Sequence, residues 1–510
     1  MDENFFRYSA LDSACMIEMH NKFWGQLHQE GYDTTYKMTV DLFPVLTYMQ
    51  TRGMRVSHSL LQETKQEVLN KAAELQVELN NLVGYPLNVN SSKQCANYFY
   101  TELGMPAIIG TKTKKVTTDD KAMQRLVRGT AKNPGLRQAK LVQDIRGLQK
   151  LYSTYLNITF DDDNRMRGSY NPRGTKFGRL SSSKTIFNTG MNFQNLPPEF
   201  KKFLVADEDY LLLEVDKKQA EWVVVAYFSN DPNMIKAIED GVDVHSYTAS
   251  LMFDVPIEVV KWDEKLIGHS TDSEAIHKIR MADEVLQKVY THKWPRSMSL
   301  RQCGKKANHG LDYDEGYFQF ALQNEITPKE AKPIVDMYHD GCYPGIRKSY
   351  EVIKRSLQKD RTLTNCFGRK VRFMGEWGPD LWKSSYSCIP QSTVVDSLNQ
   401  GMVKIYHDSL LTSLWDVQIL AQVHDSILFQ IPLSLAKNKN HFDSLLQKIY
   451  TYISPTLSYN GNDFTIGNDS KIGFNWGGKG KENAEGMRDY HSYSDLEELL
   501  KVRVQHEGTL

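Results

Sequence analysis

Residues 210–221, Tyr-Leu-Leu-Leu-Glu-Val-Asp-Lys-Lys-Gln-Ala-Glu, hold a short apolar run that ends in an aspartate. The run from Leu211 to Val215 predicts a buried strand, and Asp216 would present a carboxylate at the end of that strand. A helix is predicted directly after it, over residues 220–228. A lone aspartate at a strand end is more often a turn residue than a catalytic one. The function of Asp216 therefore depends on which side chains lie beside it in the folded protein.

A β-hairpin with an acidic tip is predicted much later in the chain. Two apolar runs, residues 417–421 and 427–431, flank a tight turn that contains Asp425. If Asp425 meets Asp216, the two carboxylates repel each other, and a shared divalent cation relieves that repulsion. Hard oxygen ligands suit Mg²⁺ or Mn²⁺ and not zinc. The two strands therefore predict a metal site that is split between distant parts of the chain.

Residues 300–313, Leu-Arg-Gln-Cys-Gly-Lys-Lys-Ala-Asn-His-Gly-Leu-Asp-Tyr, predict a helix with one basic and aromatic face. Arg301, Lys305, His309 and Tyr313 recur every four residues, and each such step turns by only about 40 degrees. Cations neutralise phosphate charge and rings offer stacking surface, so this face suits a triphosphate joined to a base. A solvated cationic face is the alternative when the helix is considered by itself.

Length and composition narrow the class of protein. A chain of 510 residues is too long for one ordinary compact domain and predicts several lobes. The 62 basic and 62 acidic residues give zero formal net charge. This balance does not exclude a nucleic-acid partner, because only the field inside a groove must be positive. The six cysteines include no close pair, which argues against a zinc knuckle or a disulfide framework and indicates a reducing cytosol. We predict neither a signal peptide nor a membrane span.

Two further helices and a basic loop are predicted in the first third of the chain. Apolar residues at helical spacing cover residues 59–83 and again about 136–157. Between them, residues 111–121 are polar and basic and predict an exposed loop. The loop is either a solvated turn or a segment that contacts phosphate.

Several motifs resemble those of the family A DNA polymerases, the enzymes like bacterial DNA polymerase I. They are GRLSSS at 178–183, QNLPP at 194–198 and VDKKQAEWVVVAYFSND at 215–231. The family's first acidic motif is Asp-Tyr-Ser-Gln-Ile-Glu-Leu-Arg, its finger helix carries Arg, Lys, Asn-Phe-Gly and Tyr, and its last motif is Gln-Val-His-Asp-Glu. The matching residues here are Asp216, Gln219, Glu221; Arg301, Lys305, Asn308, Gly310, Tyr313; and Gln422, Val423, His424, Asp425. The resemblance runs from about residue 8 to about 478.

The resemblance implies a mixed α/β (α+β) right-hand fold, with an antiparallel palm sheet and helical fingers and thumb. The implied segments are an exonuclease remnant (1–30), a palm entry segment (31–58), the thumb (59–170), the palm with the first acidic motif (171–221), the fingers (222–383) with an insertion at about 261–295, the palm with the second acidic motif (384–480) and a C-terminal tail (481–510).

The resemblance also implies roles for the residues that match. Asp216, Asp425 and the backbone carbonyl of Lys217 would hold two Mg²⁺ ions, for which Mn²⁺ can substitute. Arg301 and Lys305 would bind the phosphates of a dNTP, and Lys305 could also donate a proton to pyrophosphate. The other nucleotide-binding residues would be Gln219, Glu221, His309 and Tyr313, with Glu221 excluding a ribose 2′-hydroxyl.

Primer–template DNA is the second implied partner. Polar side chains would follow the minor groove, where acceptors look alike for all correct pairs. These are Arg179, Gln194, Asn195, Gln391 and His424. The thumb would contact duplex phosphates through Asn90, Ser91, Lys93, Lys112 and Lys114.

Four departures from the family pattern stand out. Lys217-Lys218 replaces Tyr-Ser, and position 223 is Val and not Arg. Ser426 replaces the second carboxylate of the last motif. His309 stands where the family has Phe or Tyr, and we expect it to alter discrimination against dideoxynucleotides.

The N-terminus resembles the last motif of the family's 3′–5′ exonuclease, Tyr-x-x-x-Asp, at Tyr8 and Asp12. One carboxylate cannot hold two metal ions, so we predict no proofreading by this chain alone. A separate exonuclease subunit or processivity factor is a possible partner, and a bacteriophage origin with activity in the bacterial host cytoplasm is expected.

Two other functions remain open from the sequence. Single-subunit RNA polymerases carry His-Asp-Ser in their last motif, as this chain does, but they keep a small residue where Glu221 stands. A catalytically inactive DNA-binding accessory protein is the second alternative. The joint presence of Asp216, Asp425, Arg301 and Lys305 argues against it.

Overall fold

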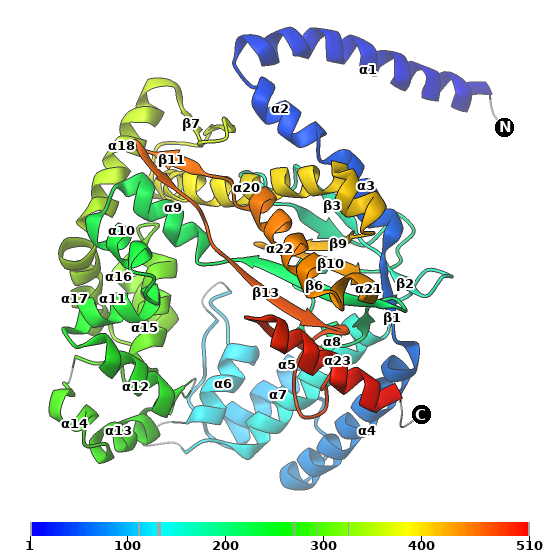
Figure 1. The fold of residues 1–510 in the computed structure, drawn as a ribbon. Helices are drawn as coiled ribbons and strands as arrows, with labels where there is room; N and C mark the ends of the chain where they lie inside the picture. The colour runs from blue at the N-terminus through cyan, green and yellow to red at the C-terminus, as the bar shows by residue number, and fades with distance from the viewer. Residues whose placement is uncertain are drawn as a thin grey trace.

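A nine-stranded sheet forms the centre of the computed structural model, which describes residues 3–110, 113–129, 134–268, 270, 272–291, 293–324 and 326–507 (Figure 1). Lys112 therefore lies outside the described residues. In spatial order the strands are β2 (Arg165–Met166), β1 (Met54–Val56), β5 (Leu204–Val205), β14 (Asn475–Gly478), β15 (Gly486–Tyr490), β13 (Asn468–Gly473), β6 (Tyr210–Lys217), β10 (Ser426–Pro432) and β9 (Gln418–Val423). Neighbouring strands are antiparallel except for β14 and β15, which are parallel.

The predicted strand and hairpin are both present and lie side by side. β6 is an interior strand, between β13 and β10, and its apolar residues Leu211, Leu212, Leu213 and Val215 are buried. β9 and β10 form the hairpin, and β10 pairs with β6 along its whole length. Gln219 adopts a left-handed backbone with φ of 51°, which turns the chain from β6 into helix α9 (Ala220–Ser229).

Two long helices cover one face of the sheet. α20 (Cys388–His407) and α22 (Lys439–Ile453) bury Leu398, Met402, Phe442 and Leu445 in one apolar core with the strands. Figure 1 shows α20 crossing above β9 and β10. This core holds β6 and the hairpin rigidly, and it therefore fixes where their ends lie.

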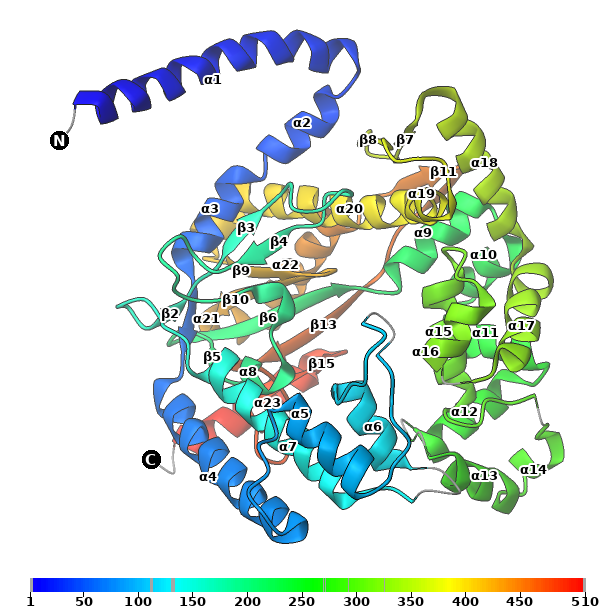
Figure 2. The ribbon, with the colours of Figure 1, turned by 180° about the vertical axis from the view of Figure 1, so that it is seen from behind.

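Two groups of helices form separate lobes with cores of their own (Figures 1 and 2). The α4–α7 lobe consists of α4 (His58–Val83), α5 (Ser92–Ala96), α6 (Asp120–Arg128) and α7 (Arg137–Lys150). The α9–α18 lobe consists of α9, α10 (Pro232–Glu239), α11 (Val244–Phe253), α12 (Ile257–Ile267), α13 (Ser273–Ala282), α14 (Leu286–Val289), α15 (Leu300–Leu311), α16 (Tyr317–Asn324), α17 (Pro328–Asp336) and α18 (Pro344–Asp360).

The remaining elements are short or peripheral. Helix α1 (Glu3–Gln29) extends away from the rest of the chain and buries none of its residues (Figures 1 and 2). The others are α2 (Asp33–Val40), α3 (Phe43–Arg52), α8 (Pro198–Lys201), α19 (Pro379–Tyr386), α21 (Leu433–Ala436) and α23 (Tyr493–Glu507), the two-stranded sheets β3–β4 (Ser169–Asn171, Ser181–Ser183), β7–β8 (Thr362–Thr364, Lys370–Arg372) and β11–β12 (Leu457–Tyr459, Asn462–Phe464), and short helices at Asn97–Glu102, Leu151–Leu156, Phe193–Asn195, Met337–Cys342 and Leu410–Leu414.

Two predicted segment limits differ from the structure. The expected tail, residues 481–510, contains β15, which lies inside the sheet between β14 and β13, and α23, which buries Leu496 and Leu499 completely. The expected thumb, residues 59–170, contains β2, which belongs to the central sheet. Both strands are short and polar, and neither has the apolar alternation by which a strand is recognised in a sequence.

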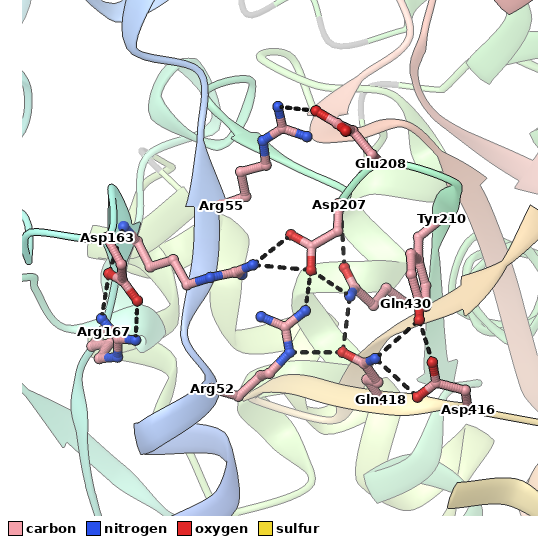
Figure 3. A network of polar contacts seen from close by, with 11 residues as sticks. Arg52, Arg55, Asp163, Arg167, Asp207, Glu208, Tyr210, Asp416, Gln418 and Gln430 are labelled. Carbon is pink, nitrogen blue, oxygen red and sulfur yellow. Dashed lines mark hydrogen bonds and ion pairs between the residues drawn. The ribbon is translucent and has the colours of Figure 1, made fainter. Parts of the chain in front are cut away.

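A polar network fixes the start of β6, at the opposite end from Asp216 (Figure 3). Asp207, just before the strand, accepts a hydrogen bond from Arg52 of α3 and one of 2.9 Å from Arg165 of β2. Gln430 of β10 donates to the same carboxylate at 3.0 Å. These contacts join four elements that are distant in the sequence, and they help to set the register of β6 in the sheet.

Within the described residues, no helix combines the length and the apolar character that crossing a membrane needs.

Candidate active site

The two predicted aspartates meet at the end of β6. Asp216 lies opposite Ser426 in the pairing of β6 with β10, and Asp425 precedes that serine in the hairpin turn. The Lys217 backbone N–H donates a hydrogen bond of 3.1 Å to the Asp425 carbonyl oxygen, which ties the turn to the strand end. The Asp216 side chain is exposed on the sheet, but partial desolvation by the surrounding protein, then the negative charges of Asp425 and Glu214, raise its pKa to about 7.

The Lys217 side chain points away from this carboxylate pair. It is buried, and its ammonium donates to the carbonyl oxygen of Ile453 and, at 2.7 Å, to the Ser454 hydroxyl at the C-terminal end of α22. Burial lowers the pKa of Lys217 to about 7, so hydrogen bonds, and not a full positive charge, hold this amine at the helix end. The departure from the family's Tyr at position 217 is therefore a structural anchor, and only the backbone of Lys217 belongs to the site.

The carboxylate pair fits a magnesium site. Asp216 opens into a hollow of 480 Å³ that is also lined by Glu214, His424, Ser426 and Asp469. Among the described residues, no three Asp, Glu, His or Cys side chains lie together closely enough to hold an ion by themselves. Mg²⁺ commonly takes one or two carboxylates and completes its shell with water and phosphate oxygens. Two aspartates and a backbone carbonyl match that donor set, whereas a zinc site would need more nitrogen or sulfur ligands.

The raised pKa of Asp216 predicts how the metal-free protein responds to pH. Because the folded-state pKa lies above the ordinary value, Asp216 contributes stability at low pH that is lost as the pH rises through about 7. We expect Asp216→Asn to raise the melting temperature in EDTA at pH 8, with a smaller gain at pH 5. Thermal unfolding of wild type, Asp216→Asn and the control Asp489→Asn measures this. A variant less stable than wild type at pH 8 would contradict it.

Helix α15 places the predicted basic face opposite the sheet end. Gly304 lets α15 pack closely on α11, because an added Cβ would lie 2.3 Å from the His245 carbonyl oxygen. Arg301 makes a two-pronged ion pair with Asp243, at 2.9 and 3.0 Å. Burial by itself would raise the pKa of Asp243, but hydrogen bonds from Arg301 and from the side chain and backbone of Ser246 lower that pKa to about 2. Lys305 and His309 are exposed on the same helix.

The N-terminus of α15 is held by the predicted insertion, residues 261–295. Asp263 of α12 and Arg280 of α13 are fully buried and pair at 2.8 Å. The Asp263 carboxylate also accepts the backbone N–H of Leu300, the first residue of α15, at 2.7 Å. Arg280 donates to the Met298 carbonyl oxygen at 3.0 Å. This segment thus forms helices, and it supports the helix that carries Arg301.

Tyr313 lies two residues beyond the end of α15, so the prediction of a helix to residue 313 was wrong at its C-terminus. The helix stops at Leu311. The Tyr313 hydroxyl donates to the Glu221 carboxylate at the start of α9, and Arg179 forms an ion pair with the same carboxylate. Burial and the Glu221 charge hold the pKa of Tyr313 well above its usual range. These contacts connect α9, α15 and the loop before β4.

Four of the predicted DNA-binding residues line one hollow of 240 Å³ beside the hairpin turn: Arg179, Gln194, Asn195 and His424. Gln194 accepts from the His424 backbone N–H at 2.9 Å and donates to the Gln422 carbonyl oxygen at 2.8 Å. Gln391 is half-buried on α20 and does not line this hollow. Asn90 and Lys93 are exposed on the α4–α7 lobe, apart from the other four.

A family model describes most of the chain. DNA polymerase family A matches residues 58–266 and 261–476. This chain belongs to DNA polymerase family A.

Individual relatives of this family A chain are distant and longer. DNA polymerase I of Rhizobium leguminosarum is 26% identical over 447 residues, which cover 83% of this chain and 39% of that protein. DNA polymerase I of Pseudomonas aeruginosa is 24% identical over 490 residues, covering 92% and 47%. The chain thus spans less than half the length of these relatives.

A solved structure confirms the predicted right-hand fold. The chain superposes on the POL domain of Pol1 from M. smegmatis, which was solved in complex with DNA primer-template and dNTP. The TM-score is 0.67 at 23% identity, over 86% of this chain and 70% of that chain.

Three residues that position the candidate site were missed in the sequence. Glu214 could have been found, because it stands two positions before Asp216 and side chains at that spacing share a face of a strand. Asp243 and Asp263 gave no such signal. Their partners, Arg301 and Arg280, are separated from them by 58 and 17 positions.

Proposed function

We propose that this family A chain is a DNA-directed DNA polymerase that extends a primer on a DNA template with dNTPs. The proposal rests chiefly on one observation, the meeting of Asp216, near the end of β6, with Asp425, in the turn that leads into β10. Family membership supports the choice of DNA over an RNA polymerase or an inactive accessory protein. The Mycobacterium POL domain, with primer-template and dNTP bound, supports the same partners.

Two Mg²⁺ ions, for which Mn²⁺ can substitute, would activate the primer 3′-hydroxyl and stabilise the leaving pyrophosphate. Asp216, Asp425 and the Lys217 carbonyl would hold them. Each residue offers a hard oxygen ligand, which is the type these ions prefer.

The nucleotide would bind between the sheet end and α15. Arg301 and Lys305 would bind its phosphates, and Lys305 would donate a proton to pyrophosphate. Asp243 keeps the Arg301 guanidinium in one orientation, so little side-chain freedom would be lost on binding. Gln219 would contact the nucleotide, His309 would lie against its sugar and base, and Tyr313 would lie beside the templating base.

Glu221 would select deoxynucleotides by occupying the space of a ribose 2′-hydroxyl. Tyr313 and Arg179 both hold its carboxylate, so the side chain cannot easily move aside. We expect Glu221→Ala to raise the ratio of NTP to dNTP incorporation by about 10- to 200-fold, the range that one group's steric fit can supply. Glu221→Gln keeps the size and should keep the selectivity. Single-nucleotide incorporation with competing substrates measures the ratio. An alanine variant that extends primers with wild-type selectivity would refute the role.

Primer–template DNA would lie along the hollow beside the hairpin turn. Arg179, Gln194, Asn195, Gln391 and His424 would contact the minor groove. Asn90 and Lys93, on the α4–α7 lobe, and Lys112 would contact duplex phosphates, where positive charge supplies affinity without reading sequence. A separate exonuclease subunit or processivity factor, a bacteriophage origin and a lack of proofreading stay predictions from the sequence.

Primer extension tests the proposal. Wild type on a primed DNA template with Mg²⁺ should add dNTPs and should add NTPs far more slowly. Extension with NTPs in preference would indicate an RNA polymerase. Tight binding to the primed template without extension, in either Mg²⁺ or Mn²⁺, would indicate an accessory protein.

A further inference from the structure

Glu214 and Asp216 stand on one face of β6, because side chains two positions apart point to the same side of a sheet. Across the strands, Asp216 faces Ser426 on β10 and Asp469 on β13. Glu214 faces Lys471 on β13. The hollow at the end of β6 is lined by all five of these residues. Besides Asp216, the hollow thus holds the carboxylates of Glu214 and Asp469, together with the basic side chain of Lys471.

A hydroxyl connects Glu214 to the hairpin. The Ser426 Oγ lies 3.0 Å from Glu214 Oε1 and 3.0 Å from the Val423 carbonyl oxygen. Ser426 is buried and has one hydroxyl proton, which these two acceptors share. The carboxylate of Glu214 is thereby held against the residue that follows Asp425.

Position 426 is also where this chain departs from the Gln-Val-His-Asp-Glu motif, with a hydroxyl in place of the second carboxylate. The neighbouring strand brings a carboxylate to that same hydroxyl. The acidic charge that the hairpin lacks is thus present 3.0 Å away, on β6.

We propose that Glu214 is the third acidic group of the metal-binding face, held there by Ser426, and that it raises the affinity of that face for divalent ions. The inference rests on the proposed function, which assigns the ions to Asp216 and Asp425. Since no three acidic side chains among the described residues lie close enough to hold an ion together, Glu214 acts as a nearby negative charge and not as a direct ligand. It is a positioning residue for the ions, comparable to the outer partners that tune many metal sites.

Manganese binding to the protein alone tests this role. Free Mn²⁺ is titrated by electron paramagnetic resonance, without DNA or nucleotide, for wild type and Glu214→Gln. The glutamine keeps the shape and removes the charge, and we expect it to weaken Mn²⁺ binding by about tenfold. Asp489→Asn is the matched control, because Asp489 lines the same hollow on the more distant strand β15. It should bind Mn²⁺ like wild type.

Two outcomes of that titration would overturn the inference. Glu214→Gln could bind Mn²⁺ as wild type does and change only the melting temperature, which would mean that Glu214 merely balances Lys201 and Lys471 in the same hollow. Alternatively, Asp469→Asn could show the loss in place of Glu214→Gln. Asp469 would then be the third acidic group.

Exchanging the side chains of positions 214 and 426 distinguishes an effect on ion binding from a purely structural role of Glu214. Glu214→Ser alone should lose about tenfold in Mn²⁺ affinity, like the glutamine variant. The double variant Glu214→Ser with Ser426→Glu rebuilds the carboxylate–hydroxyl pair in reverse, and we expect it to recover most of the affinity. The proposal would be contradicted if the double variant had a wild-type melting temperature but did not recover Mn²⁺ affinity.

The same experiments separate this inference from the proposed function. Mn²⁺ binding decides the role of Glu214 whether or not a primer is extended. If wild type extends primers and Glu214→Gln binds Mn²⁺ normally, only the present inference fails. If wild type never extends a primer, the proposed function fails, and the titration still reports on Glu214.

Discussion

Asp216→Ala and Asp425→Ala are each expected to reduce primer extension by about 10³-fold or more. Each variant removes a carboxylate ligand from the two proposed metal ions, which withdraws several kcal/mol of stabilisation from the transition state. Every 1.36 kcal/mol changes the rate by a factor of about ten. The two residues act on the same ions. The double variant should therefore be hardly slower than either single one, as happens for groups that work as a unit.

Single-turnover extension of a labelled primer, with saturating dNTP and Mg²⁺, measures these rates. Asp489→Ala is the control, because Asp489 lines the same hollow but is not assigned to the ions. Circular dichroism and melting temperature confirm that each variant folds. An Asp425→Ala extension rate within tenfold of the wild-type rate would show that the hairpin aspartate is not a metal ligand. The proposal of a metal site shared by Asp216 and Asp425 would then be wrong.

Breaking the buried ion pair of the insertion should destabilise the α9–α18 lobe by about 3–5 kcal/mol. Arg280→Met leaves the Asp263 carboxylate buried without its cation, although that carboxylate still accepts the Leu300 N–H. Urea unfolding should therefore show a large loss for Arg280→Met. Because Asp263 also holds the first turn of α15, the KM for dNTP should rise in the same variant.

Two comparisons make this prediction specific. Lys332→Met removes one partner of the exposed pair Lys332–Asp336 and should leave the urea unfolding curve almost unchanged. Replacing both buried partners, as in Asp263→Leu with Arg280→Met, should recover stability relative to Arg280→Met, since no charge is left buried and unpaired. A loss below about 1 kcal/mol for Arg280→Met would contradict the bracing role.

The centre of the fold could be predicted from the sequence because its strands are mostly apolar. Residues 211–213 and 427–429 are apolar and buried on both faces, and such runs are recognisable without any partner. Asp216 and Asp425 are easily noticed in the sequence because each stands close to one of these apolar runs. The long helix α4 was predicted within a residue of its limits, since its apolar positions repeat regularly over seven turns.

The parts that escaped prediction depend on long-range contacts. β15 is a five-residue strand with a buried arginine, and only its neighbours in the sheet make it a strand. The ion pair of Arg301 with Asp243 joins two helices. The spacing of apolar residues along each helix gives no information about such a contact. The end of α15 at Leu311 was missed because Tyr313 continues the four-residue spacing after the backbone has left the helix.

Locating the ions tests the central claim most directly. Crystals of the protein with primer–template and a non-hydrolysable dNTP analogue, soaked in Mn²⁺, would reveal manganese by its anomalous scattering. We predict two peaks beside the nucleotide phosphates, with at least one ion bound by both Asp216 and Asp425. Manganese bound elsewhere, or carboxyl groups of Asp216 and Asp425 that share no ion, would contradict the account.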